Sequence, residues 1–262
     1  VIIGGGLAGL TSAIHLSKTN FSVLLIEKNT YPKHKVCGEY ISNEVLPYLN
    51  YLGFNPFEFG AKQISKFELT TYNNKTITAN LPLGGFGMSR YQMDYQLYKR
   101  ALETGVEVLQ DAVTDVNFTS DNFQIETKSS KSFQAKIVIG AFGKRSNLDV
   151  KFNRKFITKK SPYLGVKMHV SGNFPEDKLA LHNFKGGYCG VSKVENDHIN
   201  LCYITDFKAF KKYKDINAFQ NEVVFKNSAL KDVFKSSKPE FEIPLTISQI
   251  SFETKSQIEN HI

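Results

Sequence analysis

The N-terminal stretch Val1-Ile2-Ile3-Gly4-Gly5-Gly6-Leu7-Ala8-Gly9 decides the fold. An apolar strand runs directly into glycines that have the spacing G-x-G-x-x-G. The next residues, up to about Lys18, carry apolar side chains at helical spacing. A second apolar strand follows and ends on Glu27, 18 residues past the last glycine. This order of strand, turn, helix, strand and acid predicts a βαβ unit that binds a dinucleotide.

Each glycine of the motif has a physical role. Gly4 allows a tight turn off the strand, Gly6 has no Cβ and lets a pyrophosphate approach the backbone, and Gly9 lets the helix pack close to the strand. The helix begins at Leu7 and Ala8, whose free N–H groups and about half a positive charge face the phosphates. These five residues are therefore predicted to bind the cofactor.

Glu27 is predicted to accept hydrogen bonds from the ribose hydroxyls. A carboxylate about 4 Å from a 2′-phosphate would cost on the order of 4 kcal/mol at an effective dielectric of about 20, which argues against NADP at this site. FAD and NAD remain. Glu27 leads into a basic loop that contains Pro32 and Gly38 rather than into another helix and strand, and this favours FAD. Lys28 and Lys35 in this loop face either phosphate or solvent.

Three later blocks are informative together. They are Lys35-Val36-Cys37-Gly38, then Arg90-Tyr91-Gln92-Met93-Asp94 with Gly105-Val106-Glu107-Val108, and then Gly140-Ala141-Phe142-Gly143-Lys144-Arg145-Ser146. They resemble the geranylgeranyl reductase branch of the p-hydroxybenzoate hydroxylase-type flavoproteins, over most of residues 1–150. The resemblance implies FAD as cofactor and NAD(P)H as reductant, without a second Rossmann domain.

The resemblance also implies roles for single residues. Arg90 lies near the FAD, where a guanidinium suits phosphate or flavin oxygens; the alternative is a surface ion pair with Asp94. Val113 offers backbone groups to the adenine or is an ordinary core valine, and Gly143 permits close approach to the cofactor or only a turn. Cys37 lies near the flavin ring as a reactive thiol, or it is a small buried hydrophobe.

Residues 186–188, Gly-Gly-Tyr, resemble the first half of the reductases' substrate-cavity motif. Tyr188 is therefore a candidate substrate residue. Gly190 stands where the motif has tryptophan, and the chain contains no tryptophan, so specificity for a geranylgeranyl chain does not carry over. The missing tryptophan also argues against flavin-dependent halogenases, whose motif needs two.

Two departures from the family pattern concern the FAD site. Phe142 stands where the family has aspartate, and the family's later Gly-Asp motif is not found. The sequence ends about where that motif is expected to begin, so we expect it to be part of a longer protein. The same departures motivate a second hypothesis, a flavin-binding protein without turnover.

Composition excludes several classes of protein. Hydrophobic residues make up 41% of the 262 residues and charged residues 22%, which indicates a globular chain. No apolar run is long enough to span a membrane. Three unclustered cysteines and no metal-ligand pattern predict free thiols, no metal and a cytoplasmic protein. The net charge of +8 indicates a solvated basic face or attraction to anionic partners, including a membrane surface; no nucleic-acid motif accompanies it.

The predicted fold class is α/β, a Rossmann-like FAD-binding domain with a β-rich substrate domain built on an antiparallel sheet. Residues 1–60 and 85–150 are assigned to the first domain, and 61–84 and 151–262 to the second. The predicted elements are a hairpin over 64–81, a flexible glycine link over 84–87, a helix that begins with a Ser89–Gln92 capping box, and a long buried strand over 132–141. The buried face of that helix is predicted to be Leu97, Tyr98, Ala101 and Leu102. Strands over 163–171, 178–184, 188–194 and 199–204, one helix over 215–234 and a strand over 241–252 follow.

These observations predict an FAD-dependent oxidoreductase, reduced by NAD(P)H, that acts on an apolar substrate. Two reactions stay open: reduction of a C=C bond in an isoprenoid-like lipid, and hydroxylation of an aromatic or polyketide-like substrate. Peripheral association with a membrane surface is a further expectation.

Overall fold

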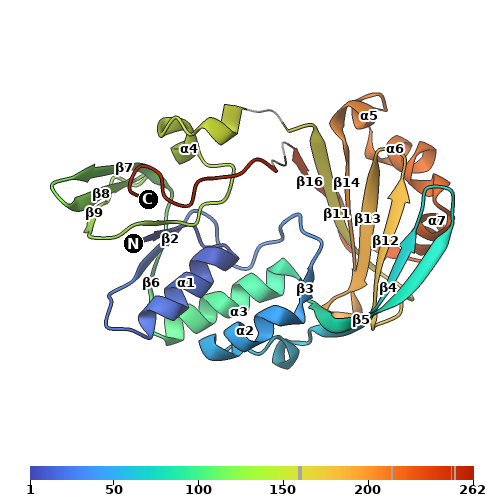
Figure 1. The fold of residues 1–262 in the computed structure, drawn as a ribbon, viewed down its shortest axis with the longest axis horizontal. Coiled ribbons are helices and arrows are strands. Elements are labelled where there is room, and N and C mark those ends of the chain that lie inside the picture. The colour runs from blue at the N-terminus through green and yellow to red at the C-terminus, as the bar shows by residue number, and fades with distance from the viewer. Residues whose placement is uncertain (159–160, 214, 249, 251) are drawn as a thin grey trace.

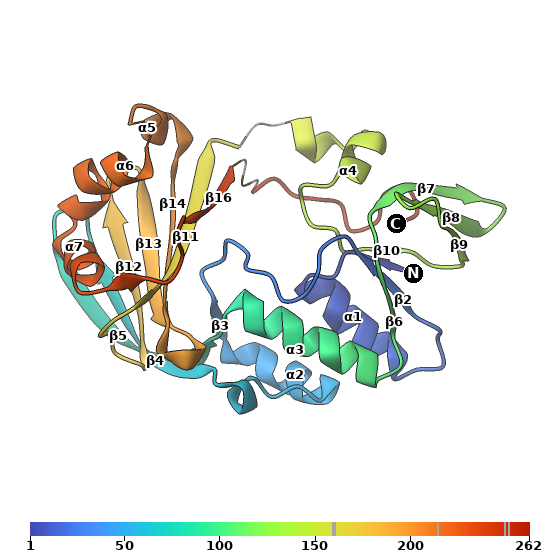
Figure 2. The same cartoon turned by 180° about the vertical axis from the view of Figure 1, so that it is seen from behind.

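The computed structural model describes residues 1–158, 161–213, 215–248, 250 and 252–262. Figures 1 and 2 show two units side by side, one built on a small parallel sheet and the other on a large, mainly antiparallel sheet. The α/β fold class predicted from the sequence is therefore confirmed. The chain passes between the units more than once, since β3, β4 and β5 of the second sheet separate α1 from α3 of the first unit.

The first unit is a four-stranded parallel sheet in the order β10-β1-β2-β6. Its strands are β1 (Ile2–Ile3), β2 (Leu24–Glu27), β6 (Glu107–Gln110) and β10 (Ile139–Gly140). Helices α1 (Leu7–Ser17), α2 (Leu46–Leu52) and α3 (Arg90–Glu103) cover one face (Figure 1). A three-stranded sheet of β7 (Val113–Thr119), β8 (Asn122–Thr127) and β9 (Ser132–Ala135) lies at the other face. Apolar side chains fill both faces, for example Leu10 and Ile14 under α1.

The second unit is a nine-stranded sheet. Its strands are β3 (Tyr40–Ser42), β4 (Lys62–Thr70), β5 (Thr76–Gly87), β11 (Tyr163–Ser171), β12 (Lys178–Phe184), β13 (Gly187–Lys193), β14 (Ile199–Asp206), β15 (Lys238–Pro239) and β16 (Leu245–Ser248). Every pair is antiparallel except β4 with β12. Alternate residues of β11, such as Val166 and Met168, pack with α5 (Phe207–Lys211), α6 (Ile216–Glu222) and α7 (Ser228–Lys235). The residues between them face the first unit.

The remaining helical segments are short. They are α4 (Asn147–Lys151) and the 3₁₀ turns Asn43–Val45, Pro56–Phe59, Lys155–Thr158, Glu195–Asp197 and Val224–Lys226. The single helix predicted over 215–234 is wrong. Asn227 ends the 3₁₀ turn in extended backbone and caps α7 through its side chain, so α6 and α7 are separate helices.

Three other sequence expectations are wrong. Residues 84–87 are not a flexible link but the end of β5, and a Cβ on Gly87 would lie 1.9 Å from the Lys193 carbonyl oxygen. The strand over 132–141 is interrupted between β9 and β10, and Ile137 there is 64% exposed. Leu102 is 45% exposed, whereas Leu97 and Ala101 are buried as predicted and Met93 joins them on the buried face of α3.

Two parts of the predicted organisation are only partly described. Of the strand expected over 241–252, only Leu245–Ser248 is observed, as β16, and residues 241–244 are not strand. Residues 249 and 251 lie outside the described residues, as do Lys159 and Lys160 of the basic cluster. The domain division stays a prediction. The last residues, which were assigned to the second domain, contact the first unit. The His261 ring stacks 4.4 Å from the Phe118 ring, and Ile262 packs against the core beneath β7–β9. Among the described residues, no helix has both the length and the apolar character needed to cross a membrane.

His182 on β12 gives the second unit a pH-dependent stability. The residue is 1% exposed, and its Nδ1 lies 2.8 Å from the Thr70 hydroxyl. Burial lowers its pKa from 6.5 to about 4. The unfolded state therefore takes up a proton between these pH values and the folded state does not, so stability falls as the pH drops from about 6.5 to 4. We expect this group to contribute a loss of about 3 kcal/mol.

The measurement is urea unfolding at pH 7, 5.5 and 4. In the variant His182→Asn, which keeps a polar atom near Thr70, the loss should be smaller than in the wild type by that amount. His15→Asn, at an exposed position, is the matched control and should follow the wild-type curve. Parallel curves for wild type and His182→Asn would contradict the assignment.

Candidate nucleotide site and the junction beneath it

The glycine turn leads from β1 into α1, and its geometry leaves no room for side chains at two of the three glycines. Gly4 has a φ of +104°, and a Cβ there would lie 2.5 Å from the Ala141 carbonyl oxygen. A Cβ on Gly9 would lie 1.8 Å from the Gly4 carbonyl oxygen. These contacts hold α1 close against β1 and aim the helix N-terminus past the end of the sheet.

Gly6 differs from its neighbours because it borders open space. The nearest atom to a Cβ placed on Gly6 is Nη2 of Arg90, at 3.9 Å. The backbone of Gly6 is extended and caps α1, so the N–H groups of Leu7 and Ala8 follow in the first turn. A phosphate in this space meets helix N–H groups and a guanidinium. The cradle therefore fits the dinucleotide predicted from the sequence.

Glu27 ends β2 beside this cradle. Its Oε2 accepts a hydrogen bond from the Gly5 N–H at 2.6 Å, and its Oε1 accepts from the backbone and side chain of Asn29 at 2.9 and 2.6 Å. Asn29 was missed by sequence reasoning; a polar residue two positions after the acid was the only signal. Lys28, predicted to face phosphate or solvent, is exposed.

A small cavity adjoins Glu27. It has a volume of about 10 Å³ and is lined by Glu27, Asn29, Thr30, Tyr31, Lys33, Lys35 and Asp94. A space of this size holds about one water. This cavity is therefore too small for a ribose.

Arg90 is the first residue of α3 and is largely buried. Its Nε and Nη2 donate to the two carboxylate oxygens of Asp94 at 2.7 and 2.9 Å, and Asp94, 1% exposed, also accepts from Lys35 at 2.6 Å. Burial opposes ionisation of Arg90, but its bonds to Asp94 outweigh burial and raise its pKa. The sequence left open whether Arg90 forms a surface pair or a cofactor contact. The pair with Asp94 exists, but it is buried and holds the guanidinium next to Gly6.

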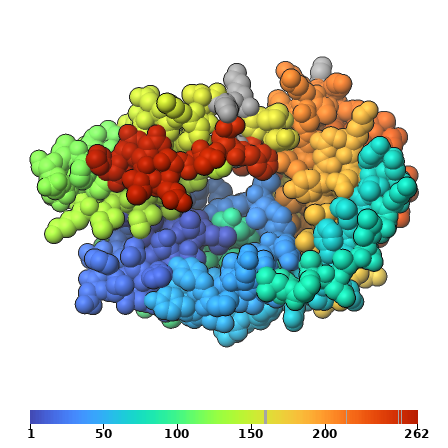
Figure 3. Space-filling model, in the orientation of Figure 1, coloured from blue at the N-terminus to red at the C-terminus, as the bar shows by residue number. Residues whose placement is uncertain are grey.

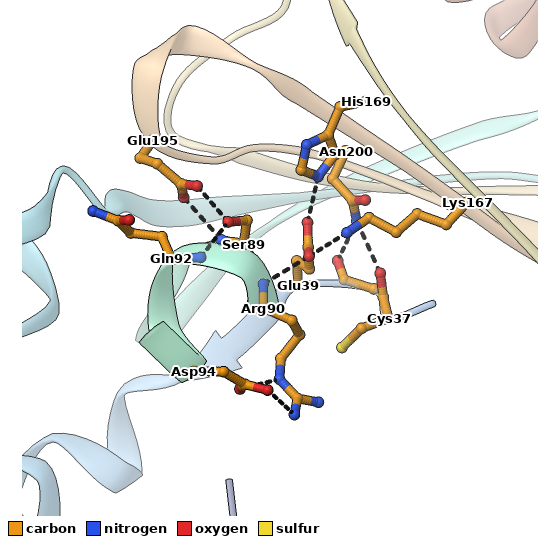
Figure 4. A network of polar contacts seen from close by, with 11 residues as sticks. Cys37, Glu39, Ser89, Arg90, Gln92, Asp94, Lys167, His169, Glu195 and Asn200 are labelled. Atoms are coloured by element: carbon orange, nitrogen blue, oxygen red, sulfur yellow. Dashed lines mark hydrogen bonds and ion pairs between the residues drawn. The ribbon is translucent and has the colours of Figure 1, made fainter. Parts of the chain in front are cut away.

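Glu39 was missed by sequence reasoning, although it is the centre of a buried charge network (Figure 4). Its carboxylate accepts from the Arg90 backbone N–H at 2.8 Å, from Lys167 Nζ, and from His169 Nε2 at 2.7 Å. Glu39 and Lys167 have fully buried side chains. Burial alone would raise the pKa of Glu39, but the hydrogen bond from His169 and the charge of Lys167 hold it below its ordinary value.

Two further contacts fasten the same junction. Glu195, on the turn between β13 and β14, accepts from the backbone N–H of Ser89 at 2.8 Å and from its hydroxyl. Asn200 on β14 donates to the carbonyl oxygens of Cys37 and Gly38 at 3.3 and 2.8 Å. Ser89 caps α3 by accepting from the Gln92 N–H; Glu195, not the Gln92 side chain predicted by the capping box, binds the Ser89 backbone N–H. The second sheet thus fixes both α3 and the Cys37–Gly38 loop.

Cys37 is half-buried and its thiol lies against the Arg90 side chain (Figure 4). Gly38 beside it is exposed and borders open space. Figure 3 shows an opening between the N-terminal part of the chain and the strands of the second sheet. Cys202 faces Cys37 from β14, and burial raises the pKa of its thiol to about 12. All three cysteines are free thiols.

One face of the second sheet is turned to the first unit. This face is polar at β11 and becomes apolar toward β12 and β4. Lys167 on β11 is in register with Cys202, which is in register with Gly190. Gly190 pairs with Leu181, and Leu181 with Leu69. Tyr188, the candidate substrate residue, lies on the same face of β13 and is 46% exposed.

Val113 and Gly143 follow segments that contact the cradle: the Asp111 N–H donates to the Glu27 carbonyl oxygen at 3.0 Å, and Ala141 lies against Gly4. Val113 begins β7 at an irregularity of the strand pairing and is partly buried in the core of the first unit. Gly143 has a φ of +73°, and no atom lies within 4 Å of the position that a Cβ would take there. Phe142 precedes Gly143, and the Lys255 Nζ lies over the Phe142 ring, 4.2 Å from the ring centre. Among the described ranges, no three metal-binding side chains gather closely enough to hold an ion.

Comparison with known proteins agrees with this geometry. A family described as an NAD(P)-binding Rossmann-like domain matches residues 2–62. An uncharacterized protein of Methanosarcina barkeri is 30% identical over 191 residues, 70% of this chain and 46% of that protein. A flavin-dependent halogenase of Armillaria mellea is 29% identical over 132 residues, 46% of this chain and 26% of the relative. A menaquinone reductase of Mycobacterium tuberculosis is 22% identical over 217 residues, 77% of this chain and 53% of the relative.

Solved structures share the fold over nearly the whole chain. A flavin-dependent brominase matches with a TM-score of 0.77 and 19% identity over 94% of this chain and 66% of its own. A halogenase in complex with phloroglucinol and FAD matches with a TM-score of 0.77 and 15% identity over 95% of this chain and 59% of its own. The chain spans about half or less of the curated relatives. Over the part that it spans, the chain shares the Rossmann-like FAD-binding fold of these flavin-dependent structures.

Proposed function

We propose that this chain is the FAD-binding and substrate-facing part of an oxidoreductase that acts on an apolar substrate. One observation carries the proposal: Gly6 borders open space at the N-terminus of α1 with the Arg90 guanidinium beside it. This combination of N–H groups and a fixed cation suits a pyrophosphate. Relatives with assigned activities, such as the menaquinone reductase, support it.

The residues of the cradle then have separate tasks. Gly6, Leu7 and Ala8 receive the phosphates, Arg90 neutralises their charge, and Glu27 accepts from ribose hydroxyls. A bound flavin would supply the redox chemistry, while the protein orients it and excludes water. Gly38 borders open space and Cys37 beside it is half-buried, and these are the residues we place nearest the reacting ring.

The substrate class follows from the sheet face beyond the junction. Leu69, Leu179 and Leu181 on this face are only partly buried, and Tyr188 adds a half-exposed ring with a polar tip. Such a wall suits an apolar ring or chain. Reduction of a C=C bond and hydroxylation both remain compatible with it, with NAD(P)H as the proposed electron donor for either.

The test begins with the absorbance spectrum of the full-length protein, which should show the two visible bands of oxidised flavin. Bleaching of these bands by NADH or NADPH without oxygen would identify the donor. Turnover of a quinone or polyprenyl substrate is then compared with and without oxygen. Product formed only with oxygen excludes the reductase, and a colourless protein that binds no adenine dinucleotide overturns the proposal.

A flavin-binding protein without turnover is the second candidate. Phe142 motivates it, because an apolar ring covered by Lys255 replaces the polar group that the resemblance leads one to expect. This candidate predicts flavin that NAD(P)H does not bleach. Bleaching with product formation would exclude it.

Replacement of Glu27 by alanine should weaken FAD binding by about 1–3 kcal/mol, the range for a hydrogen bond to a charged group. The measurement is the dissociation constant from fluorescence titration of flavin-free protein. Asn29→Ala is the matched control, because it removes one 2.6 Å bond to Glu27 but leaves the carboxylate. Equal affinity of Glu27→Ala and wild type would count against the ribose contact.

A further inference from the structure

A row of titratable side chains runs outward from Glu39. His169 on β11 is bonded to Glu39 and has 4% of its side chain exposed. The His198 ring stacks on His169 with centroids 6.0 Å apart and planes at 14°. His198 Nδ1 lies 4.0 Å from Glu240 Oε1, and the Glu240 backbone N–H donates to the His169 carbonyl oxygen at 2.9 Å.

Exposure increases step by step along this row. The side chain of Glu39 is 0% exposed, that of His169 4%, that of His198 34% and that of Glu240 36%. The buried Glu39 carboxylate is thus followed by two stacked imidazole rings, the outer of which is partly exposed. The row therefore leads from the junction under the Cys37–Gly38 loop toward bulk solvent.

The row and the His34 ring beside it contain polar atoms without a hydrogen-bond partner. Nδ1 of His198 and Nδ1 of His34 are buried and have no hydrogen-bond partner among the described residues. The His34 ring meets the edge of His169 at 5.3 Å. Buried imidazole nitrogens without a protein partner are positions that ordered water satisfies. One bridging water between the stacked rings would make the row continuous.

The groups packed around His169 come from several elements. Lys167 lies on the same strand, β11, and His34 comes from the loop after β2. His198 and Glu240 come from the second sheet, and the Phe241 ring lies 5.1 Å from the His169 ring. Phe241 and Tyr91 also enclose His34, at 4.7 and 4.4 Å. Burial, with the charges of Lys167 and His169, lowers the pKa of His34 to about 4, and its ring meets His169 only at the edge, so His34 lies beside the row.

We propose that Glu240, His198, His169 and Glu39 carry protons between solvent and the open space at the Cys37–Gly38 loop. The inference rests on the proposed function, and both of its reactions consume a proton. Reduction of a C=C bond uses NAD(P)H and H⁺ to add two hydrogens and give NAD(P)⁺. Hydroxylation uses O₂, NAD(P)H and H⁺ to give one hydroxyl, one water and NAD(P)⁺. Imidazole suits the relay because each ring nitrogen can accept or release a proton near neutral pH.

Turnover tests the outer part of the row, which lies away from the cradle. In His198→Gln and Glu240→Gln, kcat should fall about tenfold or more at pH 7 to 8 while KM stays within about twofold, as expected for loss of proton transfer. Added imidazole should restore much of kcat in His198→Gly. Glu242→Gln, at an exposed position two residues further on, is the matched control and should behave as wild type.

A second measurement needs neither substrate nor flavin. In histidine NMR spectra of the full chain, Glu240→Gln should shift the imidazole resonances of both His198 and His169, whereas Glu242→Gln should change neither. Normal kcat in both variants without an imidazole effect, or unchanged imidazole resonances, would overturn the relay. Absence of flavin binding would overturn the proposed function instead, and the spectra would still decide whether the row is coupled.

Discussion

Replacement of Gly6 by valine will yield a folded protein that retains no FAD. The apoprotein tolerates the change because Gly6 has φ −80° and ψ −173°, which valine adopts, and the nearest atom to a new Cβ is 3.9 Å away. The added methyl groups fill the space in front of α1 that a pyrophosphate needs. Because the N–H groups and Arg90 act on the same phosphates, loss of their joint contact should reduce affinity by at least about a hundredfold.

The measurements are flavin content after purification and the melting temperature of flavin-free protein. Wild type should carry flavin and Gly6→Val none, with melting temperatures of the two apoproteins within about 2 °C. Gly9→Val is the contrasting control, because its Cβ would lie 1.8 Å from the Gly4 carbonyl oxygen. That variant should lose stability as well as flavin. Normal flavin content in Gly6→Val would place the cofactor elsewhere.

This contrast between neighbouring glycines indicates what the sequence could predict. The spacing G-x-G-x-x-G and the acid at Glu27 describe contacts within one short βαβ unit, where each residue is close in sequence to its partner. The helix was expected over residues 7–18 and is observed over Leu7–Ser17. Alternating strands of the second unit, such as Tyr163–Ser171 and Lys178–Phe184, were likewise predicted with their observed bounds.

The junction was not predictable in the same way. Glu39 meets Lys167 and His169 across 128 and 130 residues of chain, and no local pattern marks a charged residue of a basic loop as buried. The Arg90–Asp94 pair has the spacing of a surface ion pair, but tertiary packing buries it, and Lys35 and Cys37 from the loop after β2 contact it. Gly85 and Gly87 suggested flexibility, whereas they serve the close approach of neighbouring strands.

Replacement of Glu39 by glutamine is expected to cost about 3–5 kcal/mol of stability, because it leaves the buried Lys167 ammonium without its counter-charge. The pKa of Glu39 is lowered in the folded state, so its contribution is present above an ordinary carboxyl pKa and is lost as the pH falls through the lower, folded value. The difference between wild type and Glu39→Gln should therefore be largest near neutral pH and shrink in acid. Urea unfolding at several pH values measures it.

A matched cycle separates the buried charge from the shape of the site. Lys167→Met in the Glu39→Gln background removes the unpaired cation, and should recover a large share of the lost stability. Lys178→Met breaks the partly exposed pair with Glu68, at 21% and 19% exposure, and should cost only about 1 kcal/mol or less. If the double variant is no more stable than Glu39→Gln, the unpaired Lys167 charge is not the cause. The φ of +56° at Glu39, a conformation that costs about 1–3 kcal/mol, would then be the feature that the carboxylate bonds hold in place.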